Sequence, residues 1–295
     1  MFSKLSEFKA IEAQIKRARE DWLRAPSLDA IRESFEELCQ ADQPRPPSVV
    51  AAIAGVPTET FGVDYSGCAA LYLHGGGYQI GSTQSHRNLI DALSRAAERP
   101  VIGVNYRLAP EFRYPAALLD ALAVYRELTS AGKAMSLMGD SAGAGLVLAL
   151  FQMIRSEGLP LPPRIVLISA WLDLSLSGAS YTERAGEDIF STTEALALMA
   201  RSYVGRHGTV DDPLVSPVRM ALDGLPPTLI HAGGADITLS DSEDFATRAR
   251  DAGRKVELKV WDGMFHHFQM FTDLPQSRES IAEIGSFLNT AAHPT

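Results

Sequence analysis

The sequence predicts an α/β fold in which helices cover both faces of one mostly parallel sheet, with further helices forming a cap. Short apolar runs alternate with amphipathic helical stretches from about residue 100 onward, which is typical of parallel βαβ units. This alternation is interrupted once, over residues 172–225. Two helical segments lie at the start of the chain, before the first strand candidate. A chain of 295 residues is long enough for one large α/β domain with such an elaboration.

The first 46 residues are predicted to form two helices, the N-terminal part of the cap. Phe8, Ile11, Ile15 and Trp22 recur at helical spacing. Ser27 then precedes a second apolar stripe, where its hydroxyl could cap the next helix. The proline-rich stretch ADQPRPP ends this helical region.

The α/β core is predicted in two parts, residues 47–171 and 226–295, which flank a cap insertion at 172–225. The core strands are expected as short apolar runs at residues 48–54, 59–63, 69–74, 100–106, 135–139, 164–170, 227–233 and 256–263. Helical patterns lie between them at residues 116–128, 144–156, 242–253 and 277–291, and within the insertion at 192–204. The rhythm of strand, loop and helix favours a sheet that is covered on both faces.

Composition and charge disfavour several classes of function. The chain has 27 Lys and Arg against 36 Asp and Glu, a net charge of −9, which disfavours nucleic-acid and membrane partners. Cys39 and Cys68 lack the spacing of a disulfide framework or a metal site. No apolar signal segment opens the chain, so we expect a cytoplasmic protein.

A short motif at residues 139–143 indicates a nucleophilic serine. Ser141 stands between Gly139 and Gly143, after an apolar strand candidate and before an apolar helix candidate. In this G-x-S-x-G pattern the turn is so tight that only small residues fit, and the serine hydroxyl projects above the sheet. The dipole at the N-terminus of the following helix stabilises the negative charge that develops on the substrate when the serine attacks. A glycine-rich turn with an incidental serine is the alternative interpretation.

A serine of this kind needs a histidine base later in the chain. His266, His267 and His293 are the histidines that follow a late strand, and His293 lies close to the C-terminus. His266 and His267 come directly after the last strand candidate, where a loop would reach the serine.

The acid partner is expected after the preceding strand. The segment at residues 228–245 offers Asp236, Asp241 and Glu243. Asp236 comes first after the strand and its Gly-Gly turn, so we assign it as the acid. Asp241 and Glu243 fall at or within the next helix and are expected to cap it or to face solvent.

A second glycine-rich loop, His74-Gly-Gly-Gly-Tyr78, follows the strand candidate at 69–74. Three glycines allow backbone N–H groups to point into a cavity. This loop is expected to complete an oxyanion hole with the N–H of Ala142. The phosphate-binding patterns G-x-G-x-x-G and Gly-Lys-Ser/Thr do not occur here, so nucleotide binding is disfavoured.

From about residue 70 onward, the chain resembles the hormone-sensitive-lipase-like carboxylesterases of the α/β-hydrolase fold. The resemblance rests on HGGGY, NYRLAPE, GDSAGAG, GGADITLSD and WDGMFHHF. It implies a serine esterase with Ser141 as nucleophile, Asp236 as acid and His266 as base. It further implies that Gly76 and Gly77 donate to the oxyanion together with Ala142.

Two departures from the family pattern are Ile237, where relatives often have Pro, and His267, where relatives often have Gly. Tyr78 and Asp140 are assigned to the substrate pocket, with the charge of Asp140 pointing away from the oxyanion. Other polar residues of these motifs are expected to support the fold rather than to bind substrate: His74, His86 at a helix start, Arg107, Glu111 and His231.

The expected partner is therefore a small-molecule ester, with no metal and no organic cofactor. The alternatives are a non-catalytic ligand-binding protein on the same fold, and an amidase or peptidase that uses the same triad. The family includes dimers, so the resemblance leaves two oligomeric states open, a homodimer and a monomer. The cap segment from 172 to Phe190 is mostly small and polar, which predicts a preference for short to medium acyl chains, from acetate to about hexanoate.

Overall fold

A single eight-stranded sheet forms the centre of the computed structural model, which describes all residues except 1, 26, 41–44, 64–67, 207 and 291–295. The strands lie in the order β1-β2-β4-β3-β5-β6-β7-β8. Their bounds are β1 (Ser48–Ile53), β2 (Val56–Phe61), β3 (Cys68–Leu73), β4 (Val101–Val104), β5 (Ala134–Asp140), β6 (Ile165–Ile168), β7 (Thr228–Gly233) and β8 (Val256–Trp261). Only the pairings made by β2 are antiparallel, so the predicted, mostly parallel sheet is confirmed.

Helices occupy most of the stretches between the strands. The α-helices are α1 (Phe2–Arg24), α2 (Leu28–Gln40), α3 (Arg87–Ala97), α4 (Ala116–Ser130), α5 (Ala142–Ser156), α6 (Ser180–Glu183), α7 (Thr193–Val204), α8 (Leu239–Asp251) and α9 (Pro275–Asn289). Two short 3-10 helices are η1 (Pro217–Arg219) and η2 (Phe268–Met270). None of the helices in the described ranges is long and apolar enough to cross a membrane.

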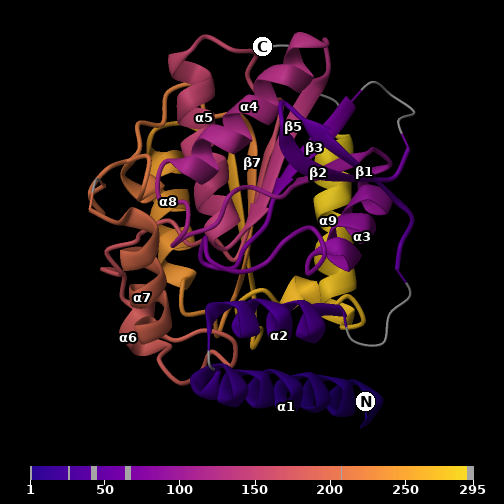
Figure 1. Ribbon diagram of the computed structural model, residues 1–295, viewed down its shortest axis with the longest axis vertical. Helices are drawn as coiled ribbons and strands as arrows, with labels where there is room; N and C mark the ends of the chain where they lie inside the picture. Colours follow the sequence, from indigo (N-terminus) through magenta and orange to yellow (C-terminus); the bar gives the residue numbers. More distant parts are fainter. Residues whose placement is uncertain (1, 26, 41–44, 64–67, 207, 291–295) are drawn as a thin grey trace.

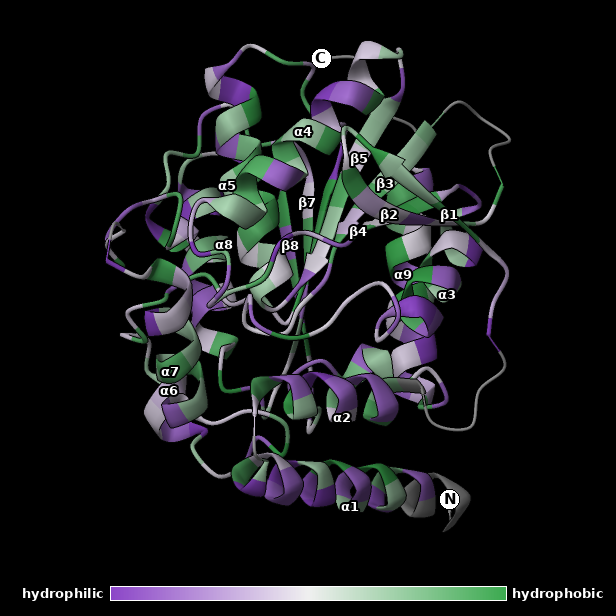
Figure 2. Ribbon diagram, viewed as in Figure 1, coloured by the Kyte–Doolittle hydropathy of each residue, from purple (hydrophilic) through white to green (hydrophobic). Residues whose placement is uncertain are grey.

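The sheet is covered on both faces because its side chains alternate. In β3, Leu71 and Leu73 pack with α4, α5 and α8, while Ala70 and Tyr72 pack with α3 and α9 on the other face. Figure 1 shows these two helix layers flanking the strands. The central strands are mostly hydrophobic, whereas α1 mixes hydrophilic and hydrophobic residues (Figure 2). Burial on both faces explains why the strands read as continuous apolar runs in the sequence.

The N-terminal helices form a cap. α1 and α2 lie side by side at one end of the sheet, and α6 and α7 lie at the same end (Figure 1). Ile15 of α1 packs in one apolar cluster with Trp261, the last residue of β8, and with Phe268, which follows that strand. The segment between β6 and β7 contains α6, α7 and η1, as expected for an insertion. The proposed boundaries at residues 46, 171 and 225 stay a prediction.

Candidate active site

Ser141 lies in the turn between β5 and α5, with φ 49° and ψ −121°. A residue with a side chain adopts this conformation only when the surrounding structure holds it there. Its N–H donates to the carbonyl of Ile168 at 2.9 Å. A Cβ on Gly139 or Gly143 would collide with neighbouring backbone carbonyls, so only glycine fits at these two positions. The turn has the tight geometry that the G-x-S-x-G pattern predicts.

The structure brings Ser141, His266 and Asp236 into one hydrogen-bonded row. The distance from Ser141 Oγ to His266 Nε2 is 2.9 Å, and that from His266 Nδ1 to Asp236 Oδ1 is also 2.9 Å. All three residues are buried. Thr238 donates from its backbone N–H and its hydroxyl to the same Asp236 oxygen, which fixes the carboxylate.

The electrostatics of this row favour an ionised Asp236 beside a basic His266. Burial raises the pKa of Asp236, but the charge and hydrogen bond of His266 outweigh it, and the pKa is lowered overall. Burial lowers the pKa of His266, and the carboxylate of Asp236 reverses this to a raised pKa. With Nδ1–H donated to Asp236, Nε2 is left to accept the proton of Ser141.

The glycine loop after β3 leaves donors unused beside Ser141. Gly76 and Gly77 adopt φ of 107° and 60° and line the same cavity as Ser141. Any side chain on Gly77 would collide with Met199 of α7. Within the part of the chain that the structure describes, the N–H groups of Gly76, Gly77 and Ala142 donate no hydrogen bond. Such free donors are suited to an oxyanion.

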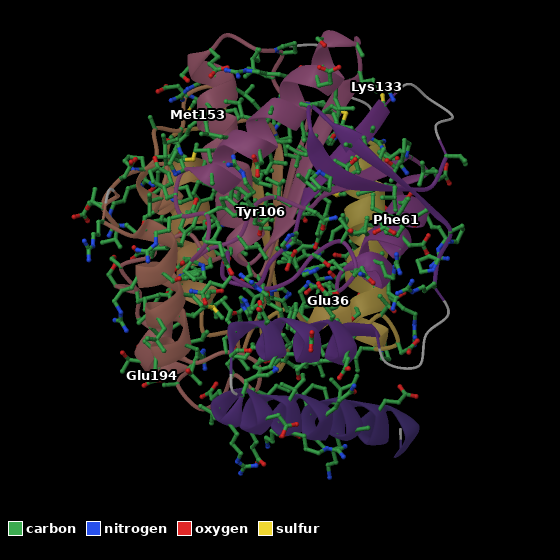
Figure 3. The ribbon with its side chains drawn as sticks, viewed as in Figure 1. Glu36, Phe61, Tyr106, Lys133, Met153 and Glu194 are labelled. Carbon is green, nitrogen blue, oxygen red and sulfur yellow. The ribbon has the colours of Figure 1, made fainter. Side chains whose placement is uncertain are left out.

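His74 and Tyr106 support this loop from the interior of the molecule. Their rings stack with centroids 4.2 Å apart, and the Tyr106 hydroxyl donates to the carbonyl of His74 at 2.6 Å. Tyr106 lies in the interior of the molecule (Figure 3). Burial lowers the pKa of His74 to about 3, so its ring is neutral near pH 7.

The assignment of Asp140 to the substrate pocket was wrong. Its side chain is fully buried and does not line the cavity. Oδ1 accepts hydrogen bonds from the Tyr72 hydroxyl at 2.6 Å and from the N–H of Gly75 at 3.0 Å. The backbone turns abruptly at Ser141, where φ is 49°, so the side chains of Asp140 and Ser141 point in different directions. Asp140 therefore holds the start of the glycine loop, and the expectation that its charge points away from the oxyanion stays a prediction.

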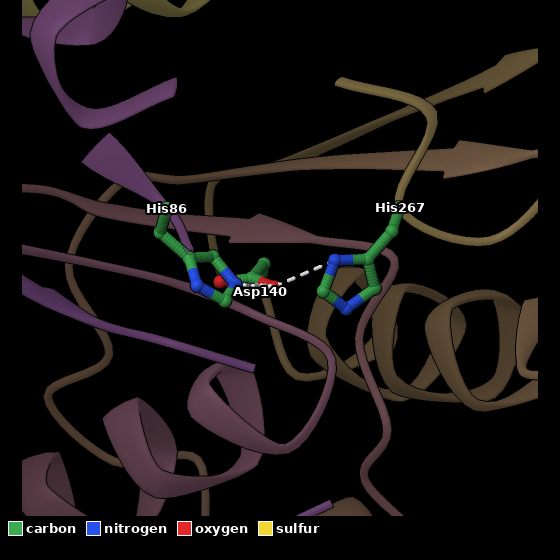
Figure 4. A group of neighbouring side chains, drawn as sticks. All are labelled: His86, Asp140 and His267. Carbon is green, nitrogen blue, oxygen red and sulfur yellow. Dashed lines mark hydrogen bonds and ion pairs between the residues drawn. The ribbon is translucent and has the colours of Figure 1, made fainter. Parts of the chain in front are cut away.

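Two histidines complete the contacts of Asp140. Nδ1 of His267 lies 2.9 Å and Nε2 of His86 lies 3.3 Å from Asp140 Oδ2. Figure 4 shows the two rings on opposite sides of the carboxylate. The sequence predicted only that His86 starts a helix, and it does precede α3 directly. Its contact with Asp140 was missed, because no local pattern reports a contact across 54 residues.

The assignment of Tyr78 to the pocket was also wrong. Its ring stacks on Tyr203 of α7, with centroids 3.7 Å apart and planes 8° apart, and it is buried. Tyr78 is not among the residues that line the cavity. Its backbone is left-handed, with φ 61°, which directs the side chain away from the path of the preceding glycines.

A carboxylate that the sequence did not single out lies beside the acid. Asp188 precedes α7 and is buried. One carboxylate oxygen of Asp188, one of Asp236 and a ring nitrogen of His266 all lie within 4.8 Å of one another. Asp188 accepts hydrogen bonds from the N–H of Ile237 at 2.9 Å and of Phe190 at 2.8 Å. Burial and the charge of Asp236 raise the pKa of Asp188 to about 6.

Asp241 and Glu243, which were given the same expectation, differ in their exposure to solvent. Glu243 is exposed, as expected. Asp241 is buried and accepts hydrogen bonds on one oxygen from the N–H groups of Leu172 and Asp173 and from the Tyr181 hydroxyl, at 2.8, 2.9 and 2.8 Å. Asp241 lies in the first turn of α8, but its carboxylate neither caps that helix nor faces solvent, so the expectation for Asp241 was wrong. Asp241 instead fixes the start of the segment that leaves β6.

The remaining polar residues of the motifs support the fold. Arg107 pairs with Asp120 at 2.7 Å. Glu111 pairs at 2.8 Å with Arg32 of α2, which also donates to the carbonyl of Gln79 at 2.8 Å. Arg32 thus ties the cap to the end of the glycine loop, a contact that the sequence did not indicate.

His231, which the sequence assigned to the core, is not part of the row that contains Ser141. His231 is buried within β7 and contacts Ser280 at 2.8 Å, as expected for a core histidine. His293 lies outside the described residues.

A cavity of about 310 Å³ opens onto Ser141. Helices α1 and α2, the glycine loop, the segment around α7 and the two adjacent histidines contribute its walls. Its large apolar lining residues are Trp22, Leu23, Ile31, Phe35, Ile80, Phe190, Leu196, Leu198 and Met199. A larger surface groove of about 990 Å³ runs between α3 and α9, but it contains none of the triad residues. The smaller cavity is therefore the candidate substrate site.

Two groups of side chains in the described ranges have the donor set of a metal site. They are His86, Asp140 and His267, and Asp188, Asp236 and His266. In both, histidine nitrogens already contact a carboxylate at 2.9 to 3.3 Å. Hydrogen bonding accounts for both groups, and a metal-free site stays a prediction.

Comparison with known proteins adds family evidence to this geometry. A family model described as alpha/beta hydrolase fold matches residues 70–270. The chain is 42% identical to an acetyl-hydrolase from Streptomyces hygroscopicus, over 76% of each chain. It is 35% identical to an esterase from Acinetobacter venetianus, over 90% of this chain and 91% of the other.

Solved structures agree with these relatives. The crystal structure of an esterase from the bacterial hormone-sensitive lipase family superposes with a TM-score of 0.91 at 35% identity. The match covers 98% of this chain and 99% of the other. Because the similarity includes both the cap helices and the sheet, it concerns the whole architecture and not the core alone.

Proposed function

The chain belongs to the hormone-sensitive-lipase family of α/β hydrolases and is a carboxylesterase, and from this premise we propose that it cleaves short- to medium-chain esters through an acyl-enzyme on Ser141. Asp236 and His266 complete the triad. The observation that carries this proposal is the unbroken row from Ser141 through His266 to Asp236, with both contacts at 2.9 Å.

Acylation begins when His266 Nε2 removes the proton of Ser141 and Oγ attacks the ester carbonyl. The carbonyl oxygen becomes an oxyanion, which accepts hydrogen bonds from the N–H groups of Gly76, Gly77 and Ala142. These donors are already oriented before substrate binds, so little reorganisation accompanies the reaction. His266 then protonates the departing alcohol, and the acyl group remains on Ser141.

Deacylation repeats the same steps with water. His266 takes a proton from a water molecule, which attacks the acyl carbonyl, and the oxyanion forms again in the same place. Collapse of this intermediate returns the proton to Ser141 and releases the acid. Asp236 holds the imidazole in the required tautomer and stabilises its cationic form throughout.

The first test is the variant Ser141→Ala, assayed on p-nitrophenyl butyrate. We expect turnover to fall by about 10⁴- to 10⁶-fold, because the residual oxyanion site and substrate binding alone remain. Ser156→Ala, a change of the same kind at the exposed end of α5, serves as the control and should keep wild-type activity. Circular dichroism checks that both variants remain folded.

Near-normal hydrolysis by Ser141→Ala would overturn the mechanism. A matched anilide, assayed in parallel, separates ester from amide cleavage. A wild-type rate on the anilide that equals the rate on the ester would favour an amidase, and tight binding without turnover would favour a non-catalytic ligand-binding protein.

A further inference from the structure

His267 occupies an unusual backbone position beside the catalytic base. Its φ is 65°, in the left-handed region that favours glycine. The chain nevertheless places an imidazole there, and that imidazole lines the substrate cavity. Its backbone N–H donates to Ser169 Oγ at 3.1 Å, which holds the conformation.

The His267 ring is fixed on three sides. Nδ1 lies 2.9 Å from Asp140 Oδ2, the contact drawn in Figure 4. The ring stacks on Phe190, with centroids 5.4 Å apart and planes 11° apart. Its Cε1–Nε2 edge faces Gly75, where an added Cβ would lie 2.7 Å from Nε2. The ring therefore has one orientation and adjoins the glycine loop.

The second nitrogen of this ring is unused. Nε2 of His267 has no hydrogen-bond partner among the described residues, and it is not sealed from solvent, unlike Nε2 of His231. Burial lowers the pKa of His267 despite the charge of Asp140, which leaves the ring neutral near pH 7. With its proton on Nδ1 beside the carboxylate, Nε2 carries a lone pair and can only accept.

This acceptor adjoins the ring of the catalytic base. The rings of His266 and His267 have centroids 4.7 Å apart, and both residues line the cavity. A donor that meets His267 Nε2 must therefore sit a few bonds from the ester carbonyl. Phe190 and Gly75, which pack on the ring, have no side-chain hydrogen-bonding group, and Met270 approaches Nδ1 rather than Nε2, with Sδ at 2.9 Å.

We propose that Nε2 of His267 accepts a hydrogen bond from a hydroxyl group of the substrate, two or three bonds from the ester, and so selects hydroxylated esters over alkyl esters of equal size. This inference rests on the proposed function of Ser141 and His266. His267 is then a specificity-determining residue, and the preferred substrates are hydroxyacyl esters or esters of diols.

The experiment compares pairs of esters that differ only by hydroxyl against methyl. In the acyl arm, each enantiomer of p-nitrophenyl 3-hydroxybutyrate is compared with p-nitrophenyl 3-methylbutyrate. In the alcohol arm, 2-hydroxyethyl butyrate is compared with propyl butyrate. The readout is the ratio of kcat/KM within each pair, after subtraction of uncatalysed hydrolysis, so that any uniform loss of activity cancels.

We expect the wild-type enzyme to prefer the hydroxylated member of one arm by about 3- to 10-fold, the usual effect of one neutral hydrogen bond. His267→Phe keeps an aromatic ring but removes the acceptor, so the ratio should fall to about 1 or below. His267→Gly, which suits the left-handed backbone, gives the same reading if the Phe variant does not fold. Ser156→Ala, at the exposed end of α5 and outside the cavity, should keep the wild-type ratio.

A wild-type ratio of 1 or less in both arms would overturn the proposal, as would a preference that survives in both His267 variants. Failure of the underlying function has a different signature. In that case Ser141→Ala would hydrolyse both members of each pair as fast as the wild-type chain.

Discussion

His266 and His267 are neighbours in the chain, yet their rings contact different carboxylates. His266 reaches Asp236 after β7, and His267 reaches Asp140 at the end of β5. The left-handed backbone at His267 separates the directions of the two side chains. Only one of them can therefore share the proton of Ser141.

This separation gives a prediction for the two histidines. His266→Ala should abolish ester hydrolysis, because no other base contacts Ser141 among the described residues. His267→Ala should lower kcat/KM for simple alkyl esters by less than about tenfold, on the order of 1.4 kcal/mol. Steady-state kinetics on p-nitrophenyl butyrate measure both, and a reversed order would show that His267 is the base.

Asp188 gives a prediction about pH. Its negative charge raises the pKa of His266, so removing that charge lowers the pKa of the base. For Asp188→Asn we expect the acidic limb of the kcat/KM profile to move to lower pH, since that limb reports protonation of His266 in the free enzyme. The plateau should fall by less than about tenfold, because the imidazolium is less stabilised.

The control for this profile is Glu187→Gln, which removes a charge one residue away. Glu187 is half exposed and pairs with Arg184, so its removal should leave the acidic limb in place. An Asp188→Asn profile identical to wild type, or one moved to higher pH, would mean that Asp188 does not act on His266.

The sequence predicted the proximity of Ser141, Asp236 and His266 better than it predicted the surroundings of this row. Ser141, Asp236 and His266 each follow a strand in a fixed order, and that order is visible along the chain. The pocket assignments of Asp140 and Tyr78 were wrong, because each side chain is held by a residue far away in the chain, Tyr72 for Asp140 and Tyr203 for Tyr78. Asp188 was missed because its partners are brought to it only by the packing of the cap on the sheet.

At the scale of elements, Arg32 is one of the side chains that hold α2 to the catalytic core, beside Glu36, which accepts a hydrogen bond from the Ser82 hydroxyl at 2.6 Å. Arg32 donates to Glu111 and to the carbonyls of Gln79 and Ala109, with the carbonyl contacts at 2.8 and 3.1 Å. The same helix contributes Ile31 and Phe35 to the cavity wall. The position of this wall therefore depends on Arg32.

We predict that Arg32→Ala raises KM by about 3- to 10-fold while kcat changes less, because substrate binding loses a fixed wall and the triad keeps its contacts. The midpoint of thermal unfolding should fall by about 2–8 °C, corresponding to about 1–2 kcal/mol. Lys16→Ala, which removes an exposed i,i+4 pair on α1, is the control. A fall in kcat at constant KM would place the role of Arg32 in the chemical step.

Element types were predictable because their hydrophobic periods are strong. The apolar runs and the amphipathic stretches gave strands and helices close to their observed places, and the break at 172–225 marked the segment with α6 and α7. Boundaries were less accurate. The strand expected at 59–63 spans Val56–Phe61, because its start at Val56 is set by the turn that pairs β2 with β1.

At the scale of the whole molecule, the substrate cavity lies between the sheet and both cap segments. Its volume of about 310 Å³ is at the lower end for small-molecule sites. The apolar wall comes mainly from α1, α2 and α7, and the polar stretch before Phe190 adds little. A growing acyl chain gains roughly 0.8 kcal/mol per methylene only while apolar wall remains to cover it.

We therefore predict that kcat/KM rises with acyl length to about hexanoate and then falls, with poor rates on long-chain triglycerides and no activation by a lipid interface. A p-nitrophenyl series from acetate to palmitate measures this directly. Values that keep rising through dodecanoate and palmitate would mean that α1 and α2 line a longer channel than the cavity indicates.

Asp140 links turnover to substrate preference, because it contacts both the glycine loop and His267. The same carboxylate holds the N–H of Gly75, at the start of the loop that faces the oxyanion, and the ring of His267, on the wall that faces the substrate. Natural variation at position 267 would therefore alter rate and substrate range together. Changes on α2 or α7, which form no hydrogen bond or ion pair with Asp140 among the described residues, would alter substrate range with a smaller effect on turnover.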